Sequence, residues 1–189
     1  MGRVYDEIDE RMAAFLLRQP VFFVGTAPRA DDGHINVSPK GMAGSFSVVG
    51  PHSIAYLDLT GSGVETIAHL RENGRIVVMV CAFQGPPRIL RLHGRGAAHL
   101  PGTPRFDELR PCFDDLAGVR SIIEVEVQRI ADSCGFGVPL MQFVDERPDL
   151  AQWALRKGPA GLAEYHARRN RVSLDGLPGI SEDGPDPGR

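Results

Sequence analysis

The sequence predicts a mainly β fold, an antiparallel barrel of about six or seven strands with helices over its openings. One reason is a series of short β-like runs along the chain, separated by glycine and proline turn signals. Another is their order, in which a single helix interrupts the strands, unlike the βαβαβ alternation of doubly wound nucleotide folds. With 189 residues, one domain is expected over residues 1–178, and residues 179–189 are expected to form a disordered tail because they lack apolar periodicity.

The first part of the chain begins with a helix and continues in strands. Asp6–Arg18 has apolar residues at helical spacing and acids in its first turn, which predicts an amphipathic helix that ends before Pro20. Four short runs rich in β-forming residues follow, each bounded by turn signals. These expected strands are Val21–Thr26, Ile35–Ser38, Phe46–Val49 and Ser53–Leu59.

The second part mixes helices with three further strands. Arg75–Phe83 is apolar on both faces, which predicts a central strand. Ser121–Ile130 alternates apolar and polar residues, a pattern typical of a half-exposed strand. The remaining expected elements are a helix over Val64–Asn73, a strand over Arg88–Ala97, a short helix at Arg105–Arg110 and two short helices within Pro148–Asn170.

Composition narrows the possible partners and the compartment. The net charge of −3 and the pI near 6.1 leave no basic excess, so we expect a small-molecule substrate and neither nucleic acid nor membrane as a partner. The longest apolar run, Ile76–Phe83, is far shorter than the roughly 20 residues that cross a bilayer. The acid-rich N-terminal segment lacks the features of a signal peptide, which favours a cytoplasmic protein.

Cysteine and histidine spacing indicates neither disulfides nor a metal site. Cys81, Cys112 and Cys134 are widely spaced and fit neither a disulfide framework nor a CxxC zinc site. The six histidines show neither HxH nor HxxxH spacing. We therefore expect free thiols and no bound metal.

A glycine-rich loop with the sequence TGSGVET, Thr60 to Thr66, follows a strand and opens a helix. Its glycines can turn backbone N–H groups toward an anion, and the first helical turn adds unpaired donors and a favourable dipole. The loop lacks the Gly-Lys-Ser/Thr ending of an ATP-binding loop and the third glycine of a dinucleotide fingerprint. An ordinary capped helix, with Ser62 as the cap and Glu65 as its capping-box partner, explains the same residues equally well.

The basic residues near this loop leave alternatives open. In Ser38-Pro39-Lys40-Gly41 a strand ends in a proline, a cation and a glycine turn, which could aim donors at a flat polar heterocycle or could form a plain hairpin end. Arg75 could reach back to a phosphate or cap the helix beside Gly74. Three arginines on the following strand cannot all face one ligand unless the strand bulges at Gly94; these are Arg88, Arg91 and Arg95.

An irregular segment with the sequence SCGFGVP, Ser133 to Pro139, follows the half-exposed strand. Cys134 lies between a serine and a glycine and could act as a nucleophile. No basic residue beside it in the sequence would activate the thiol, so a packed thiol is favoured.

In this order and spacing, the segments resemble the pyridoxamine 5'-phosphate oxidase-like superfamily of FMN-binding split barrels, in a branch of uncharacterised members. The resemblance covers Ala13–Met141 and rests on INVSPKG, YLDLTGSGVETIAHLRENGRIVVMV, PRILRLHGRG and SCGFGVP. It implies a six- to seven-stranded antiparallel split β-barrel with flanking helices, and a homodimer with FMN in clefts between the protomers. It also implies an oxidoreductase that moves hydride or electrons between a nicotinamide donor or a small organic substrate and an acceptor.

The resemblance further implies which residues contact the cofactor. The isoalloxazine edge would lie along Ser38, Pro39, Lys40 and Gly41, and the ribityl chain near Asp58. The phosphate would be held by Thr60, Gly61, Ser62 and Thr66. Arg88 would line the same cleft, and the approach from the other protomer would involve Ser133, Cys134 and Gly135. No catalytic side chain is required, because the flavin carries the chemistry, and Lys40 or the amides beside it would stabilise negative charge on the reduced ring.

The chain departs from the family pattern at two points. Relatives usually carry an Arg-Lys pair where this chain has Val64-Glu65-Thr66, so the phosphate would depend more on amides and hydroxyls. The C-terminal Trp and Arg segment of pyridoxamine oxidases is not recognisable, which weakens the case for a vitamin B6 substrate. A deazaflavin-dependent reductase and a non-catalytic flavin- or haem-binding carrier or sensor remain as alternatives.

Overall fold

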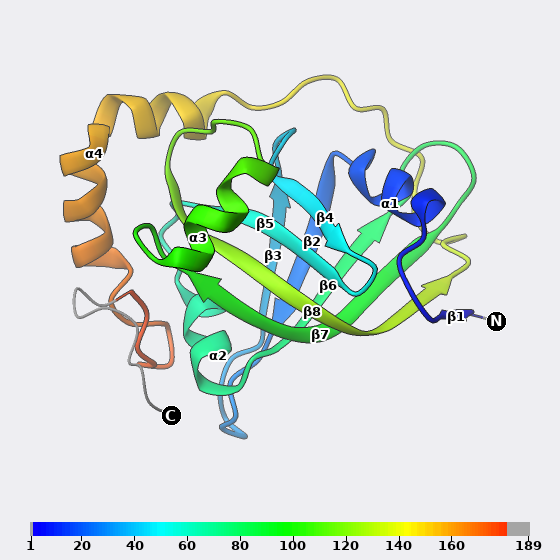
Figure 1. Cartoon of the computed structure of the whole chain (residues 1–189), viewed down its shortest axis with the longest axis horizontal. Helices are drawn as coiled ribbons and strands as arrows, with labels where there is room; N and C mark the ends of the chain where they lie inside the picture. Colours follow the sequence, from blue (N-terminus) through cyan, green and yellow to red (C-terminus); the bar gives the residue numbers. More distant parts are fainter. Residues whose placement is uncertain (1, 181–189) are drawn as a thin grey trace.

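The computed structural model describes residues 2–180 and contains one antiparallel sheet of eight strands, curled into a half-barrel (Figure 1). The strand order is β3-β2-β6-β7-β8-β5-β4, and β1 pairs with β8. The strands are β1 (Val4–Tyr5), β2 (Val21–Thr26), β3 (Asn36–Gly41), β4 (Phe46–Gly50), β5 (Ser53–Leu59), β6 (Arg75–Cys81), β7 (Ile89–His99) and β8 (Val119–Ser133). The mainly β antiparallel fold is therefore confirmed.

Four helices flank the sheet, with α1 and α2 at opposite ends of it and α4 on the outside (Figure 1). Their bounds are α1 (Glu10–Leu17), α2 (Glu65–Asn73), α3 (Pro104–Leu109), which continues into a 3₁₀ turn, η1 (Arg110–Cys112), and α4 (Asp149–Arg169). None of the helices in residues 2–180 combines the length and the apolar character that a membrane span needs.

The element boundaries differ from the sequence expectations for local reasons. Helix α1 begins at Glu10 because the Asp9 carboxylate caps it, accepting a 2.7 Å hydrogen bond from the Met12 amide. The two expected C-terminal helices are confirmed, since α4 consists of two helical parts separated at Gly158, whose φ of 63° and ψ of 172° are not helical. The two-residue strand β1 was not expected, because so short a strand carries no periodic signal.

The half-barrel encloses the main core. Phe22 on β2 packs edge-on against Phe46 of β4 and Tyr56 of β5, with ring centroids 5.0 and 5.3 Å apart. Neither β4 nor β5 is a sheet neighbour of β2, so these contacts cross the interior of the curl. Residues of α1 and α2, including Phe15 and Ile67, complete this core. Each such buried side chain contributes about 1.5–3 kcal/mol relative to an exposed one.

The edge strand β3 has a polar inner face and an apolar outer face. Its register with β2 pairs Lys40 with Phe22, Ser38 with Val24 and Asn36 with Thr26. Paired residues share a face of the sheet, so the three polar side chains of β3 point to the same side as the buried residues of β2. On the outer face Val37 is 67% exposed, and Ile35, just before the strand, is 77% exposed.

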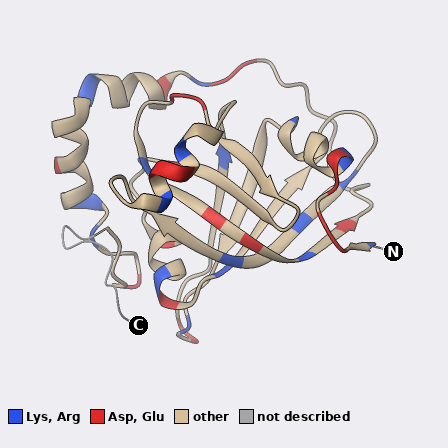
Figure 2. Cartoon of the chain, in the orientation of Figure 1, with Lys and Arg blue, Asp and Glu red and all other residues tan. Residues whose placement is uncertain are grey.

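The last described residues form a short turn against the rest of the chain. Val172 and Pro178 form an isolated bridge, and Gly179 and Ile180 donate amide hydrogen bonds to Arg171 and Asn170. The rest of the predicted tail, residues 181–189, lies outside the described residues. In Figure 2, acidic and basic positions are interspersed over the sheet and the helices.

Candidate functional site

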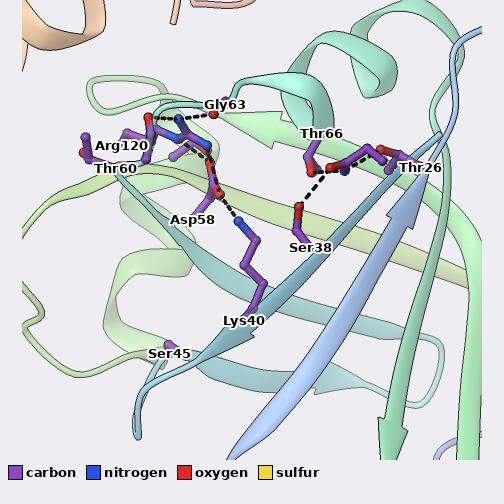
Figure 3. Close-up of polar contacts among 12 residues, drawn as sticks. Thr26, Ser38, Lys40, Ser45, Asp58, Thr60, Gly63, Thr66 and Arg120 are labelled. Carbon is purple, nitrogen blue, oxygen red and sulfur yellow. Dashed lines mark hydrogen bonds and ion pairs between the residues drawn. The ribbon is translucent and has the colours of Figure 1, made fainter. Parts of the chain in front are cut away.

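A buried carboxylate joins the two sides of the split in the barrel. Asp58, on the inner face of β5, is 0% exposed. Its oxygens accept hydrogen bonds from Lys40 Nζ at 2.9 Å, Arg120 Nε at 2.7 Å and Ser121 Oγ at 3.2 Å (Figure 3). Lys40 comes from β3, at one edge of the sheet, whereas Asp58 and Arg120 come from β5 and β8 on the other side. Among the described strands, β3 and β4 are the two ends of the sheet and do not pair with each other. The ion pair therefore connects the two sides of the split through side chains.

Two cations, Lys40 and Arg120, surround the single carboxylate of this group. Burial by itself would raise the pKa of Asp58, but the positive charges of Lys40 and Arg120 and their hydrogen bonds hold the pKa below its ordinary value. Asp58 is therefore ionised at neutral pH. Arg120 was not predicted from the sequence, because it lies in no recognisable motif. It pairs with Asp58 only because the fold brings β8 and β5 together.

Arg120 and Asn170 donate side-chain hydrogen bonds to the backbone carbonyls of the glycine-rich loop. Arg120 Nη1 donates to the carbonyls of Gly61 at 3.2 Å and Gly63 at 2.7 Å (Figure 3). Asn170 Nδ2 donates to the carbonyls of Gly61 at 2.9 Å and Ser62 at 3.4 Å. Both side chains are buried. Three consecutive carbonyls are thus turned toward the protein.

The amides of the same stretch remain available. Among the described residues, the N–H groups of residues 61–67 make no hydrogen bond, and the first helical bond of α2 runs from Ala68 N to Val64 O. The capping-box interpretation is wrong, since Val64 is the N-cap, no side chain caps it, and Ser62 is exposed. The Glu65 carboxylate instead accepts a 3.3 Å bond from the Leu174 amide. Free amides at a helix N-terminus suit a bound anion.

The two threonines of the loop play different parts. Thr60 is buried, and its hydroxyl donates to Gly118 O at 2.8 Å. Since that proton is used, His166 Nε2, 2.8 Å away, is the donor to Thr60 Oγ1. Burial, followed by the nearby Arg120 charge, lowers the pKa of His166. Thr60 therefore anchors the loop. Thr66 Oγ1 accepts from Asn36 Nδ2 at 3.1 Å, and its own proton has no acceptor among the described residues.

Asn36 organises the inner face of β3 and was missed at the level of sequence. Its amide nitrogen donates to Thr26 Oγ1 at 3.0 Å as well as to Thr66, and its oxygen accepts from Ser38 Oγ at 2.9 Å. Thr26 continues the chain to His69 Nδ1 at 3.0 Å. Figure 3 shows Thr26, Ser38 and Thr66 gathered beside the Lys40 and Asp58 group. The alternation in INVSPK, which puts Asn36, Ser38 and Lys40 on one face, was the signal that could have found it.

The other candidate residues lie at the far end of the barrel from the loop. Arg120 and Ser133 occupy opposite ends of β8, roughly 40 Å apart along the strand at about 3.3 Å per residue. Arg88 lies near Asp132, 3.6 Å away, and over the ring of Phe15 at 5.0 Å. Gly135, with φ of 69°, packs against the Arg88 backbone. Cys134 is exposed, so the interpretation as a packed thiol is wrong, because the segment after β8 runs along the surface.

These residues share a cleft with the end of β3. A cleft of about 1650 Å³ is lined by Gly41, Arg88, Ser133 and Cys134 and is covered along one side by residues 141–147. Six of the nine phenylalanines of the chain line it, namely Phe15, Phe22, Phe23, Phe46, Phe83 and Phe143. Strand β3 therefore leads from the glycine-rich loop, through Asn36, to this cleft, at Gly41. Pro39, on the outer face of β3, is exposed.

Arg75, Arg91 and Arg95 make structural contacts instead. Arg75 donates to Asn73 Oδ1 and to Pro28 O, on the side of α2 away from the loop, and Gly74 ends that helix in the left-handed conformation. Arg91 bonds Ser133 Oγ at 3.0 Å, and Arg95 bonds the Asn73 carbonyl. The ladder between β7 and β8 does shift register at His93 and Gly94. Within residues 2–180, no group of three or more His, Cys, Asp or Glu side chains is arranged to hold a metal.

Comparison with known proteins gives the family. The sequence model described as pyridoxamine 5'-phosphate oxidase matches residues 8–134. A relative from Aspergillus flavus, the pyridoxamine 5'-phosphate oxidase family protein ustO, is 41% identical over 194 residues, which cover 93% of this chain and 77% of that protein. This chain belongs to the pyridoxamine 5'-phosphate oxidase family.

Solved structures agree with the fold. A single-residue variant of HupZ from Group A Streptococcus is 18% identical, with a TM-score of 0.51, and the match covers 67% of this chain and 99% of that chain. Another HupZ structure from the same source is 18% identical, with a TM-score of 0.50, and the match covers 65% of this chain and 91% of that chain. At this level of identity the similarity concerns the fold alone.

The donor set fits the phosphate end of a flavin mononucleotide. The amides at the start of α2 and the Thr66 hydroxyl proton have no partner within residues 2–180, so they supply donors for phosphate oxygens. Ser38 Oγ gives its proton to Asn36 and so offers an acceptor, which suits a hydroxyl of a ribityl chain. The nearby acids oppose tight binding, since Asp58 offsets one of the two cations and the Glu65 carboxylate lies beside Gly63.

Proposed function

We propose that this chain is a flavin-dependent oxidoreductase that binds FMN along β3 and transfers hydride or electrons between a nicotinamide donor or small organic substrate and an acceptor. The observation that carries the proposal is the order of three features along one strand: a loop whose amides have no partner among the described residues, the polar inner face of β3, and an aromatic cleft where that strand ends. Membership of the pyridoxamine 5'-phosphate oxidase family supports it.

In this proposal the phosphate is held by the amides of residues 61–67 with Ser62 and Thr66. Thr60 and Gly61 keep the loop in shape, since the Thr60 hydroxyl and the Gly61 carbonyl already have partners within the protein. In the proposed binding mode, the ribityl chain lies near Ser38 and Asp58. The flavin ring lies near Gly41, in the cleft that Arg88 also lines. When FMN is bound, its ring supplies the hydride or electron transfer.

Lys40 is proposed to tune the flavin and not to react. Its ammonium is 2.9 Å from Asp58 and its side chain is 19% exposed, so its positive charge is partly compensated by a carboxylate. A preorganised cation near the ring would stabilise the anionic reduced form. Lys40→Met should lower the flavin reduction potential. An unchanged potential and an unchanged reoxidation rate would show that Lys40 has no such role.

The assembly and the location are also proposals. We propose a homodimer in which Ser133, Cys134 and Gly135 of one protomer approach the cofactor of the other, in the cytoplasm, with a small-molecule substrate and neither nucleic acid nor membrane as a partner. The exposed apolar residues Ile35, just before the edge strand β3, and Val37, on it, support burial against a second copy. Light scattering of the purified protein should give the mass of two chains.

The visible spectrum of freshly purified protein tests the proposal. Bound FMN should give the two flavin bands, whereas a deazaflavin or a haem would give a different spectrum and would replace FMN in the proposal. Reduction by a nicotinamide donor followed by repeated turnover on an acceptor would separate an enzyme from a carrier. A colourless protein that fails to bind added FMN would refute the function proposed here.

A further inference from the structure

The last described part of the chain converges on the glycine-rich loop. Three residues of the segment 166–180, which we call the C-terminal clamp, make hydrogen bonds to the loop or to the start of α2. His166 bonds Thr60 at 2.8 Å, Asn170 bonds the carbonyls of Gly61 and Ser62, and the Leu174 amide bonds the Glu65 carboxylate. The clamp lies outside residues 8–134, the part of the chain that matches the family model.

Asn170 is the clamp residue whose contacts fix the orientation of the peptide groups in the loop. Its side chain is fully buried, and its nitrogen donates to two successive carbonyls, while its oxygen has no partner among the described residues. The reverse orientation would set an oxygen against two carbonyl oxygens, so the amide is held in one orientation. A peptide unit whose carbonyl is fixed inward must direct its N–H outward, because the two groups are antiparallel in a planar trans peptide.

Arg120 applies the same constraint from the other side. It reaches the Gly61 and Gly63 carbonyls with one nitrogen, while Asp58 holds the rest of the guanidinium. Together the two side chains hold every carbonyl from Gly61 to Gly63. Glycine has no Cβ to stabilise one backbone orientation over another, so a loop of this composition needs such external contacts to keep its amides on one side.

We propose that Asn170, supported by Arg120, is a positioning residue that gives this chain its preference for phosphorylated over unphosphorylated flavin. The inference deepens the proposed function and depends on it. Asn170 does not touch the ligand. It acts by presenting the amides of residues 62–64, which share peptide units with the held carbonyls, to the phosphate. Its removal should weaken binding of the phosphate and leave the contacts of the ring and ribityl chain in place.

The test compares FMN with riboflavin, which lacks only the phosphate. Wild-type protein should bind FMN more tightly, as measured by quenching of flavin fluorescence. Asn170→Asp keeps the size of the side chain but sets carboxylate oxygens against the two carbonyls. It should reduce the ratio of riboflavin to FMN dissociation constants by about tenfold, equivalent to about 1.4 kcal/mol, with the riboflavin constant nearly unchanged.

Leu174→Ala is the matched control, because this clamp side chain is exposed while its amide contact is retained. It should leave the ratio at the wild-type value. If Asn170→Asp does not fold, Arg120→Lys serves as the second variant, since lysine keeps the charge beside Asp58 but cannot also reach both carbonyls. It should lower the ratio in the same direction.

The possible outcomes separate the inference from the function beneath it. A wild-type protein that binds neither flavin overturns the proposed function and this inference with it. Wild-type protein that prefers FMN, with the same preference in folded Asn170→Asp or Arg120→Lys, overturns the inference alone. Equal loss of FMN and riboflavin binding in Asn170→Asp would also overturn it, because Asn170 would then support the whole site and not the phosphate contact.

Discussion

Replacing Asp58 with asparagine should destabilise the fold more than any exposed charge change. The carboxylate is fully buried and accepts from Lys40 at 2.9 Å, from Arg120 at 2.7 Å and from Ser121 at 3.2 Å. Asparagine keeps one acceptor oxygen and replaces the other with a donor, so it can satisfy one cation at most. The other cation would face a donor in a buried site.

The size of the stability loss depends on which of the two cations can move into solvent. The Lys40 side chain is 19% exposed and can turn toward solvent, whereas that of Arg120 is 4% exposed and is held by two loop carbonyls. We expect the amide oxygen to keep Arg120 and to lose Lys40. Breaking a buried pair costs about 3–5 kcal/mol, and the escape of Lys40 places Asp58→Asn near the lower end, about 3 kcal/mol.

Urea unfolding at pH 7, followed by circular dichroism, measures this difference. Asp31→Asn is the control, an exposed acid with no ion pair among the described residues, and should change stability by no more than about 0.5 kcal/mol. Hydrogen exchange should also be faster in β3, because Lys40 no longer ties this edge strand to β5. A loss below about 1 kcal/mol would refute the account of the junction.

Two further predictions concern the same site, and a third concerns Gly135, beside the cleft. Burial opposes ionisation of Asp58, but Lys40 and Arg120 outweigh it, so the folded protein has a lower Asp58 pKa than the unfolded chain. The carboxylate therefore stabilises the fold fully above the unfolded pKa of about 3.9. This stabilisation is lost as the pH falls from that value through the lower folded pKa. The stability difference between wild type and Asp58→Asn should thus be constant from pH 7 to about pH 5 and shrink below about pH 4; a difference that is already lost at pH 6 would contradict it. Asn36→Asp should weaken FMN binding by about tenfold or more, because the carboxylate would accept the Thr66 hydroxyl hydrogen bond and add negative charge beside the phosphate. An unchanged dissociation constant in a fluorescence titration would exclude this role. Gly135→Ala should lower the unfolding free energy by about 1–3 kcal/mol, because its φ is 69° and a Cβ would lie 2.8 Å from Arg88 N; Gly137→Ala, where a Cβ has open space, should have little effect in the same denaturation assay.

Local sequence pattern was sufficient for most strands but not for the roles of the site residues. Val21–Thr26 and Ser53–Leu59 have the bounds that alternation and turn signals predict, because both signals act between near neighbours in the chain. The glycine-rich loop was found for the same reason. The part that Thr60 plays could not be found, since its partners Gly118 and His166 are 58 and 106 positions away.

The sequence alone determined a β-rich antiparallel domain, a glycine-rich loop at the start of α2 and the family, because each depends on the order and spacing of residues along the chain. Only the tertiary structure decided what holds that loop. Arg120 and Asn170 reach Gly61 from 59 and 109 positions away, and Lys40 meets Asp58 across the split of a curled sheet. No periodicity encodes such contacts, since they arise when the apolar faces of the strands are buried and the sheet closes on itself.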